Sequence, residues 1–197
     1  GHRIEDYARI ALAAGVVVKT LPSFEISEEE LRDCPELPAG AVLLLPATAS
    51  GPPVAWSGFP TLARSLRSQG LVPIFTGGPG EEDYVAEVAG SERVIPPLSL
   101  GVFAALCTRV RAIYGNDSGL SHLAAAARRG AGLSAADVHV YCGSTDPVRT
   151  AAPGSRAFRH AEPPPCWPCY RKRCRHALEC MPSQSSALQV QGPRTTG

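Results

Sequence analysis

Short apolar runs alternate with amphipathic stretches along most of the chain. The amphipathic stretches predict helices, and the apolar runs predict buried strands. The predicted strands cover residues 41–45, 71–76, 110–114 and 137–141, with a shorter piece at 94–95, and the predicted helices cover 59–68, 81–89, 99–107 and 120–127. Upstream, residues 3–14 predict an amphipathic helix closed by Gly15, with Ile4, Tyr7, Ala8, Ala11 and Leu12 on one side, and a capping box at Ser27 predicts a short helix. Strands separated by helices of about ten residues predict an α/β fold: a Rossmann-like parallel sheet with helices on both faces.

Polar turns that contain glycine or small residues follow three of the predicted strands, at 47–51, 77–82 and 116–119. The carboxyl ends of parallel strands meet at one edge of a sheet, where ligands bind, so we expect these turns to share one rim. The turn Gly115-Asn116-Asp117-Ser118-Gly119 leads into a helix that begins at Leu120. Backbone N–H groups and the helix dipole favour an anion there, above all a phosphate, and His122 lies within reach in the first helical turn. Ordinary βα turns have a similar composition, which is the alternative interpretation.

Composition limits the class of protein. Apolar residues make up 44% of the 197 positions, enough for a packed core, and the net charge of +1 argues against a general nucleic-acid binder. No apolar run approaches the roughly 18–20 residues that span a bilayer. The amino terminus has no signal-peptide pattern, so the predicted location is cytoplasmic, with at most peripheral contact to a membrane.

The seven cysteines fall into two groups. Cys34, Cys107 and Cys142 lie within predicted core elements, where we expect buried apolar side chains. The other four lie within fifteen residues: Cys166, Cys169, Cys174 and Cys180. This spacing predicts a tetrahedral thiolate site for a structural zinc ion, or for iron. Free thiols and two disulfides are the alternatives, and a cytoplasmic location argues against disulfides.

The chain is predicted to divide into three parts. Residues 1–162 are predicted to form the Rossmann-like domain, residues 163–181 a cysteine-rich appendage, and residues 182–197 a poorly ordered polar tail. Around the cysteines lies a locally basic run, for which a solvated surface is expected and contact with anionic lipid or phosphate is the alternative. Its members are Arg171, Lys172, Arg173, Arg175 and His176. His160 and His176 are alternative metal ligands for the cysteine cluster, but we expect both side chains to be exposed to solvent instead.

Several motifs, in this order, resemble the bacterial ADP-heptose:lipopolysaccharide heptosyltransferase family, glycosyltransferase family 9. They are HRIEDYARIALAAG at 2–15, PATAS…W at 46–56, TGGPGEE at 76–82, DSGLSH at 117–122, GSTDP at 143–147 and the late cysteine run. The resemblance extends from His2 to Met181. It implies the second, nucleotide-sugar-binding half of a GT-B fold. The acceptor-binding half, which supplies the general base, is missing or separate, so no catalytic residue is expected on this chain and the isolated chain is expected to be inactive.

The resemblance also implies how an ADP-sugar donor is bound for inverting transfer to a lipopolysaccharide core or a similar lipid-linked glycan. The diphosphate and sugar are expected at Asp117, Ser118, Gly119 and His122, with Ser50 and Thr48 also near phosphate. Glu81 is expected at the ribose, and the backbone near Leu98 at the adenine. A carboxylate at Glu81 or Glu82 is suited to a ribose diol. The rim turns hold no DxD-type pair of carboxylates, so metal-free stabilisation of the leaving group is expected, with no cofactor for the chemistry.

Two departures from the family pattern stand out. Val54 occupies the position, two before Trp56, where the family has a lysine that neutralises the diphosphate. The connection after the His122 helix, residues 128–137, is some seven residues longer than the family's. It begins with Arg128 and Arg129, which we expect to form a solvated, cationic helix end; electrostatic compensation for the missing lysine is the alternative.

Three hypotheses about function follow. The first is the donor-binding half of a heptosyltransferase-like enzyme. The second is a non-catalytic relic or regulatory module that keeps the fold but, with Val54 in place of lysine, has lost tight donor binding. The third is a thiolate–metal module for protein association, with the α/β domain as its scaffold.

Overall fold

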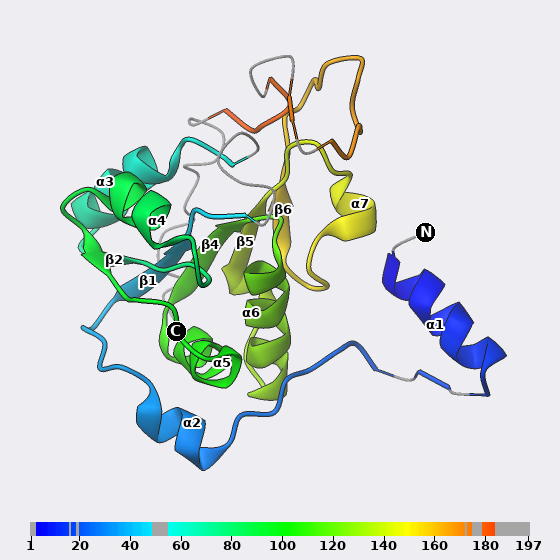
Figure 1. Ribbon diagram of the computed structural model, residues 1–197, viewed down its shortest axis with the longest axis horizontal. Helices are drawn as coiled ribbons and strands as arrows, with labels where there is room; N and C mark the ends of the chain where they lie inside the picture. The colour runs from blue at the N-terminus through cyan, green and yellow to red at the C-terminus, as the bar shows by residue number, and fades with distance from the viewer. Residues whose placement is uncertain are drawn as a thin grey trace, which may run out of the picture.

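A parallel six-stranded sheet forms the centre of the described part of the computed structural model, which comprises residues 3–15, 17–18, 20–48, 55–171, 173–174 and 179–183 (Figure 1). The strand order is β3-β2-β1-β4-β5-β6, and every pair is parallel. The strands are β1 (Ala41–Leu45), β2 (Val72–Phe75), β3 (Arg93–Val94), β4 (Ala112–Asn116), β5 (Val138–Tyr141) and β6 (Arg156–Phe158). The helices are α1 (Arg3–Ala13), α2 (Glu28–Asp33), α3 (Phe59–Ser68), α4 (Glu82–Ala89), α5 (Leu100–Arg109), α6 (Gly119–Gly130) and α7 (Pro147–Thr150), with a 3-10 turn at Ala135–Asp137.

Two apolar clusters lie on opposite faces of the sheet, so the predicted Rossmann-like arrangement is confirmed. Successive side chains of a strand point to opposite faces. On β1, Leu43 and Leu45 therefore face α5 and α6, whereas Val42 and Leu44 face α3 and α4. All five residues of β1 are buried, because the strand has neighbours on both sides and helices on both faces.

The strand that leads into the Asp117 turn, β4, is displaced from its predicted position. Helix α5 runs to Arg109, and Val110 is its C-cap, so β4 begins only at Ala112. At its other end β4 continues through Gly115 and Asn116, which pair with Val140 and Tyr141 of β5. The turn itself is therefore reduced to Asp117 and Ser118 before α6 begins. Strand β6 and helix α7 were not predicted, because each is too short to show a period.

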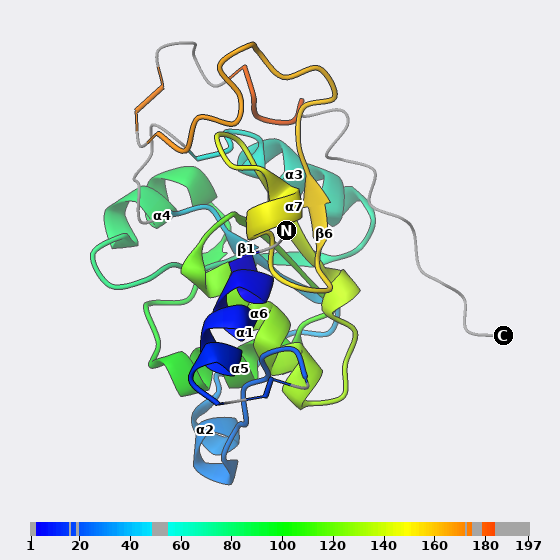
Figure 2. The same ribbon diagram turned by 90° about the vertical axis from the view of Figure 1, so that its right-hand side faces the viewer.

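Helix α1 has the predicted amphipathic pattern, but none of its residues is buried. Tyr7, Ile10 and Leu12 are each at least 60% exposed. The connection to α2 is tied to the domain: the Phe24 N–H donates to the Ala126 carbonyl at 3.1 Å, and the Arg129 Nε donates to the Pro22 carbonyl at 2.9 Å. Helix α1 itself lies at the side of the domain, near α7 (Figures 1 and 2).

The prediction of a solvated, cationic end to α6 is wrong. Arg128 is 4% exposed, and its guanidinium donates to the carbonyls of Ser134, Cys107 and Val110 at 2.9–3.1 Å and to the Asp137 carboxylate at 2.9 Å. Arg129 is half-buried and donates to backbone carbonyls as well. The last carbonyls of a helix lack partners within it, and Arg128 supplies donors where α5 ends while it also holds the long connection after α6.

Two other sequence predictions about local structure are confirmed. The capping box at Ser27 is confirmed: the Glu30 N–H donates to Ser27 Oγ at 3.2 Å, and the Ser27 N–H donates to Glu30 Oε2 at 2.7 Å. Cys34, Cys107 and Cys142 are buried as predicted. Within the described ranges, no helix is long and apolar enough to cross a membrane. The predicted tail, apart from Pro182 and Ser183, lies outside the described residues.

Candidate functional site

The largest group of predicted site residues surrounds a pocket of about 450 Å³ at the carboxyl ends of the central strands. We call it the first pocket. Five segments form it: the amino-terminal end of α1, the segment after β1, the β4–α6 turn with the start of α6, the segment between β5 and β6, and the cysteine-rich segment. Its lining residues are Arg3, Ile4, Tyr7, Thr48, Asp117, Ser118, Gly119, His122, Thr145, Arg149, Thr150, Pro153 and Tyr170. The structure therefore brings together Thr48, Asp117, Ser118, Gly119 and His122, as the sequence predicted. Ser50 and Val54 lie outside the described residues.

The end of β4 is fixed from several sides. The buried Asn116 side chain accepts a hydrogen bond from the Trp56 N–H at 2.9 Å and donates to the Pro46 carbonyl at 2.7 Å. Ser121 Oγ donates to the Asn116 carbonyl at 2.7 Å. A Cβ on Gly115 would lie 2.5 Å from Ser121 Oγ, so only glycine fits there. These contacts hold the beginning of α6 at a defined place beside the pocket.

Ser118 is the N-cap residue of α6, but its side chain makes no capping hydrogen bond. Its Oγ is buried and has no hydrogen-bond partner among the described residues. A buried hydroxyl normally has a partner, and the first N–H groups of a helix have none within the helix. This end of α6 therefore offers donors to an acceptor group in the first pocket.

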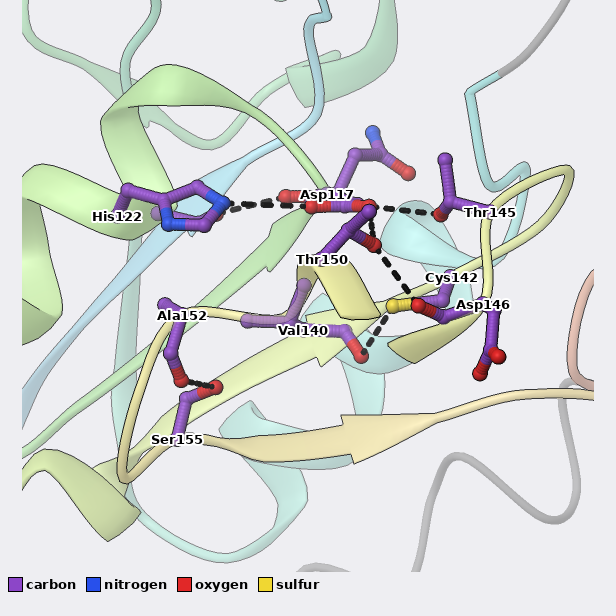
Figure 3. A network of polar contacts seen from close by, with 11 residues as sticks. Asp117, His122, Val140, Cys142, Thr145, Asp146, Thr150, Ala152 and Ser155 are labelled. Atoms are coloured by element: carbon purple, nitrogen blue, oxygen red, sulfur yellow. Dashed lines mark hydrogen bonds and ion pairs between the residues drawn. The ribbon is translucent and has the colours of Figure 1, made fainter. Parts of the chain in front are cut away.

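Asp117 is the centre of a polar network (Figure 3). Its Oδ2 accepts hydrogen bonds from Thr145 Oγ1 at 2.6 Å and from Thr150 Oγ1 at 2.8 Å. Its Oδ1 lies 3.5 Å from His122 Nε2. Burial by itself would raise the pKa of Asp117, but the hydrogen bonds from His122, Thr145 and Thr150 outweigh it, and the pKa lies below its usual value. Asp117 is therefore an anion at neutral pH.

The charge of Asp117 restricts its role. A carboxylate repels phosphate, so Asp117 is unsuited to contact a diphosphate directly. It is suited to accept hydrogen bonds from sugar hydroxyls and to orient His122, whose ring is partly exposed in the same pocket. Among the four predicted residues of this turn, Ser118, Gly119 and His122 are the ones suited to phosphate.

A second pocket, of about 280 Å³, lies beyond the carboxyl end of β2. Gly77 and Gly78, the first turn of α4 and residues 94–97 line it. The Glu81 carboxylate accepts a hydrogen bond from the Gly78 N–H at 2.7 Å, while the neighbouring Glu82 lines the pocket. Leu98 is half-buried against the core, directly after the lining residues. Because β2 is next to β1, and β1 is next to β4, the two pockets lie along the same edge of the sheet.

The cysteine-rich segment packs onto this edge. Trp167 Nε1 donates to the Gly143 carbonyl at 2.9 Å, the Tyr170 N–H donates to the Ser144 carbonyl at 3.0 Å, and Trp56 Nε1 donates to the Pro182 carbonyl at 2.9 Å. These contacts place Tyr170 in the wall of the first pocket. The predicted appendage is thus in direct contact with the candidate site.

The four cysteines of this segment differ in exposure. Cys166 and Cys174 are exposed, Cys169 is half-buried and Cys180 is buried. Burial, followed by the other three thiols, raises the pKa of Cys180 to about 11. Within the described part of the chain, which includes all four, no three histidine, cysteine or acidic side chains are arranged to hold a metal ion. His160 is half-buried, and His176 lies outside the described residues.

Sequence reasoning assigned no site role to several residues that line the first pocket, among them Arg3, Thr145, Arg149 and Thr150. The last three belong to the segment after β5, at the same edge as the turns after β1, β2 and β4. The rule that ligands bind at the carboxyl ends of parallel strands was therefore a signal that could have found this segment. No such signal existed for Arg3, which precedes the sheet by many residues.

Comparison with known proteins defines the class. Residues 5–178 match the family described as glycosyltransferase family 9 (heptosyltransferase). The chain belongs to this family, which confirms the resemblance predicted from the sequence. No curated protein matches the chain.

Solved structures of similar fold belong to the same class. The glycosyltransferase family 9 protein from Veillonella parvula is 21% identical, with a TM-score of 0.65 over 80% of this chain and 48% of that one. The E. coli ADP-heptose lps heptosyltransferase II is 21% identical, with a TM-score of 0.57 over 71% of this chain and 45% of that one. The E. coli heptosyltransferase WaaC with ADP is 23% identical, with a TM-score of 0.55 over 75% of this chain and 46% of that one. The chain thus spans about half the length of these proteins.

Proposed function

We propose that this chain binds the ADP-sugar donor of a heptosyltransferase-like enzyme, with ADP-heptose as the donor. The observation that carries the proposal is the first pocket, where the start of α6 and His122 face the same space as the fixed carboxylate of Asp117. A donor of this kind has a diphosphate for the helix start and sugar hydroxyls for the carboxylate. One WaaC structure contains ADP and another an ADP-2-deoxy-2-fluoro heptose, which supports a donor of this chemistry.

The nucleoside of the donor fits the second pocket. Its glycines allow close approach of a ligand, and Glu82 and Glu81 place carboxylates at its edge for a ribose diol. The backbone of residues 94–97, directly before Leu98, borders the same pocket and is suited to adenine. A nucleotide sugar would then lie along the edge of the sheet, from β2 at the nucleoside to β4 and β5 at the sugar.

The chemistry follows from the position of the diphosphate. In glycosyl transfer, an acceptor oxygen attacks the anomeric carbon while the bond to the diphosphate oxygen breaks, and negative charge grows on the departing ADP. The N–H groups already in place at the start of α6, together with His122, stabilise that charge. Attack from the face opposite the diphosphate inverts the anomeric carbon. The acceptor, a lipopolysaccharide core or similar lipid-linked glycan, and the general base are assigned to the other half of the enzyme. The cytoplasmic location stays a prediction.

Calorimetric titration of the purified chain tests the proposal. ADP and ADP-heptose should bind with micromolar affinity, and a UDP-sugar should bind much more weakly. His122→Ala should weaken ADP binding about tenfold, because a donor to the diphosphate is lost. His160→Ala is the matched control, since His160 lines neither pocket. If the unsubstituted chain binds neither ADP nor ADP-heptose, the hypothesis of a non-catalytic relic replaces this proposal.

A further inference from the structure

The charge balance of the first pocket is incomplete without a cation. Asp117 is anionic, and the diphosphate of the proposed donor adds two further negative charges. Backbone N–H groups and one histidine offset part of this charge, but a group of anions out of water requires cationic partners. Two guanidinium groups line the pocket, Arg3 and Arg149.

Arg149 is held in place through its neighbours. Its position in α7 lies between Thr145 and Thr150, which both donate hydrogen bonds to Asp117 Oδ2. The Asp146 carboxylate accepts a hydrogen bond from the Val148 N–H at 3.0 Å, and the Arg149 N–H donates to the Asp146 carbonyl at 2.9 Å. The backbone of Arg149 is therefore fixed relative to Asp117 and to the start of α6.

The Arg149 side chain, in contrast, is exposed. Its guanidinium has no hydrogen-bond or ion-pair partner among the described residues, unlike that of Arg128, Arg129 or Arg67. A cation on a fixed backbone, lining a pocket and without a protein partner, is available to a ligand. Arg3, also exposed, reaches the same pocket from the first turn of α1.

The sequence offers few other cationic side chains that could bind the diphosphate. The chain has only two lysines, Lys19 and Lys172, and neither lies in the turns after β1, β2, β4 or β5. Position 54, in the segment after β1, is valine. Arginine also suits the ligand, because its planar guanidinium donates two parallel hydrogen bonds to phosphate oxygens.

We propose that Arg149, assisted by Arg3, binds the diphosphate of the nucleotide sugar and supplies the positive charge that this pocket needs. The inference rests on the proposed function and names the residues that bind the donor's anionic part. Arg149 contributes from α7 in the domain, whereas Arg3 contributes from the first turn of α1.

The test is titration of the full chain with ADP at low and at high salt. Arg149→Gln should weaken ADP binding about tenfold, because a charge-assisted contact is lost. It should also reduce the salt dependence of the dissociation constant, and Arg149→Lys should restore part of the affinity. Arg3→Gln should have a smaller effect in the same direction. The matched control is Arg111→Gln, an exposed arginine at the opposite edge of the sheet, which should bind ADP as the unsubstituted chain does.

The outcomes are distinguishable. Tight ADP binding by the unsubstituted chain, together with unchanged affinity in Arg149→Gln, overturns this inference and leaves the proposed function intact. A loss of affinity in Arg149→Gln that Arg111→Gln reproduces shows a general charge effect and also overturns it. Absence of ADP binding by the unsubstituted chain overturns both. Circular dichroism and the thermal midpoint of each variant confirm that the substitutions leave the fold unchanged.

Discussion

The Asp117 carboxylate accepts a hydrogen bond of 2.8 Å from the Thr150 hydroxyl, although 33 positions separate the two residues in the chain. Thr145 donates to the same oxygen at 2.6 Å. The DSGLSH and GSTDP motifs are therefore physically joined: the second motif fixes the carboxylate of the first. This contact also determines where α7 lies relative to α6.

Replacing Thr150 by valine keeps the shape of the side chain but removes its donor to Asp117. We expect a loss of about 1–3 kcal/mol in the free energy of unfolding, because a half-buried carboxylate loses one of its hydrogen bonds. The pKa of Asp117 should rise toward its usual value, since that hydrogen bond helps to lower it. Urea unfolding and carbon NMR of the carboxylate measure the two effects. Thr108→Val is the control, because Thr108 Oγ1 donates only to the Ala105 carbonyl of its own helix; equal effects in the two variants would contradict the prediction.

Protonation of His139 should destabilise the fold in mild acid. The ring is buried between Tyr114 and Phe158, with centroids 4.3 and 5.8 Å away, and burial, aided by the charge of Arg156, lowers its pKa to about 4. The unfolded chain binds a proton near pH 6.5, whereas the folded chain does not until about pH 4. Stability should therefore be complete above pH 6.5 and fall by about 3 kcal/mol as the pH drops to 4.

The variant His139→Phe tests this pH dependence. It keeps an aromatic ring in the stack and breaks no hydrogen bond of Nδ1, which has no partner among the described residues. Urea unfolding between pH 4 and 7 should show a flatter profile for His139→Phe than for the unsubstituted chain. His160→Phe should keep the original profile, and a steep profile in His139→Phe would contradict the assignment.

Arg128 should be among the most sensitive positions outside the pockets. Arg128→Met keeps much of the side-chain volume but leaves two buried carbonyls, the Ser134 carbonyl and the Asp137 carboxylate without the donor that Arg128 supplies. We expect a loss of about 2–4 kcal/mol in the free energy of unfolding, measured with urea. Arg32→Met is the control, since Arg32 and Glu28 form an exposed pair 4.0 Å apart, for which at most ~0.5 kcal/mol is expected. Similar losses in the two variants would show that the Arg128 contacts add little stability.

The four-cysteine segment is still predicted to hold one structural metal ion, zinc or iron. Elemental analysis of the purified chain should find about one ion per chain, and Cys166→Ser with Cys169→Ser should remove it. Removal by a chelator should lower the thermal midpoint, because the same segment is bonded to Gly143 and Ser144 at the rim. Cys34→Ser, at a buried thiol outside the segment, should retain the metal. A metal-free chain with seven reactive thiols on unfolding would contradict the prediction, as would two disulfides.

Much of the fold was predictable because its signals are local. The apolar run at 41–45 and the helical stretches around it have periods that depend only on neighbouring residues, and they place β1, α3, α4 and α5 within a few positions. The capping box at Ser27 is equally local. Errors occur where two elements compete for the same residues, as at Val110, which caps α5 instead of starting β4.

The amino-acid sequence by itself determined the Rossmann-like fold, because strand and helix periods and turn chemistry depend on adjacent residues, and its ordered motifs indicated the heptosyltransferase family. Only the tertiary structure decided which partners these residues meet. It joined Asp117 to Thr145 and Thr150, brought Arg3 and Tyr170 to the same pocket, and buried Arg128 among the carbonyls of other elements. Such contacts depend on strand order and on unpaired backbone groups that meet only when distant segments pack together.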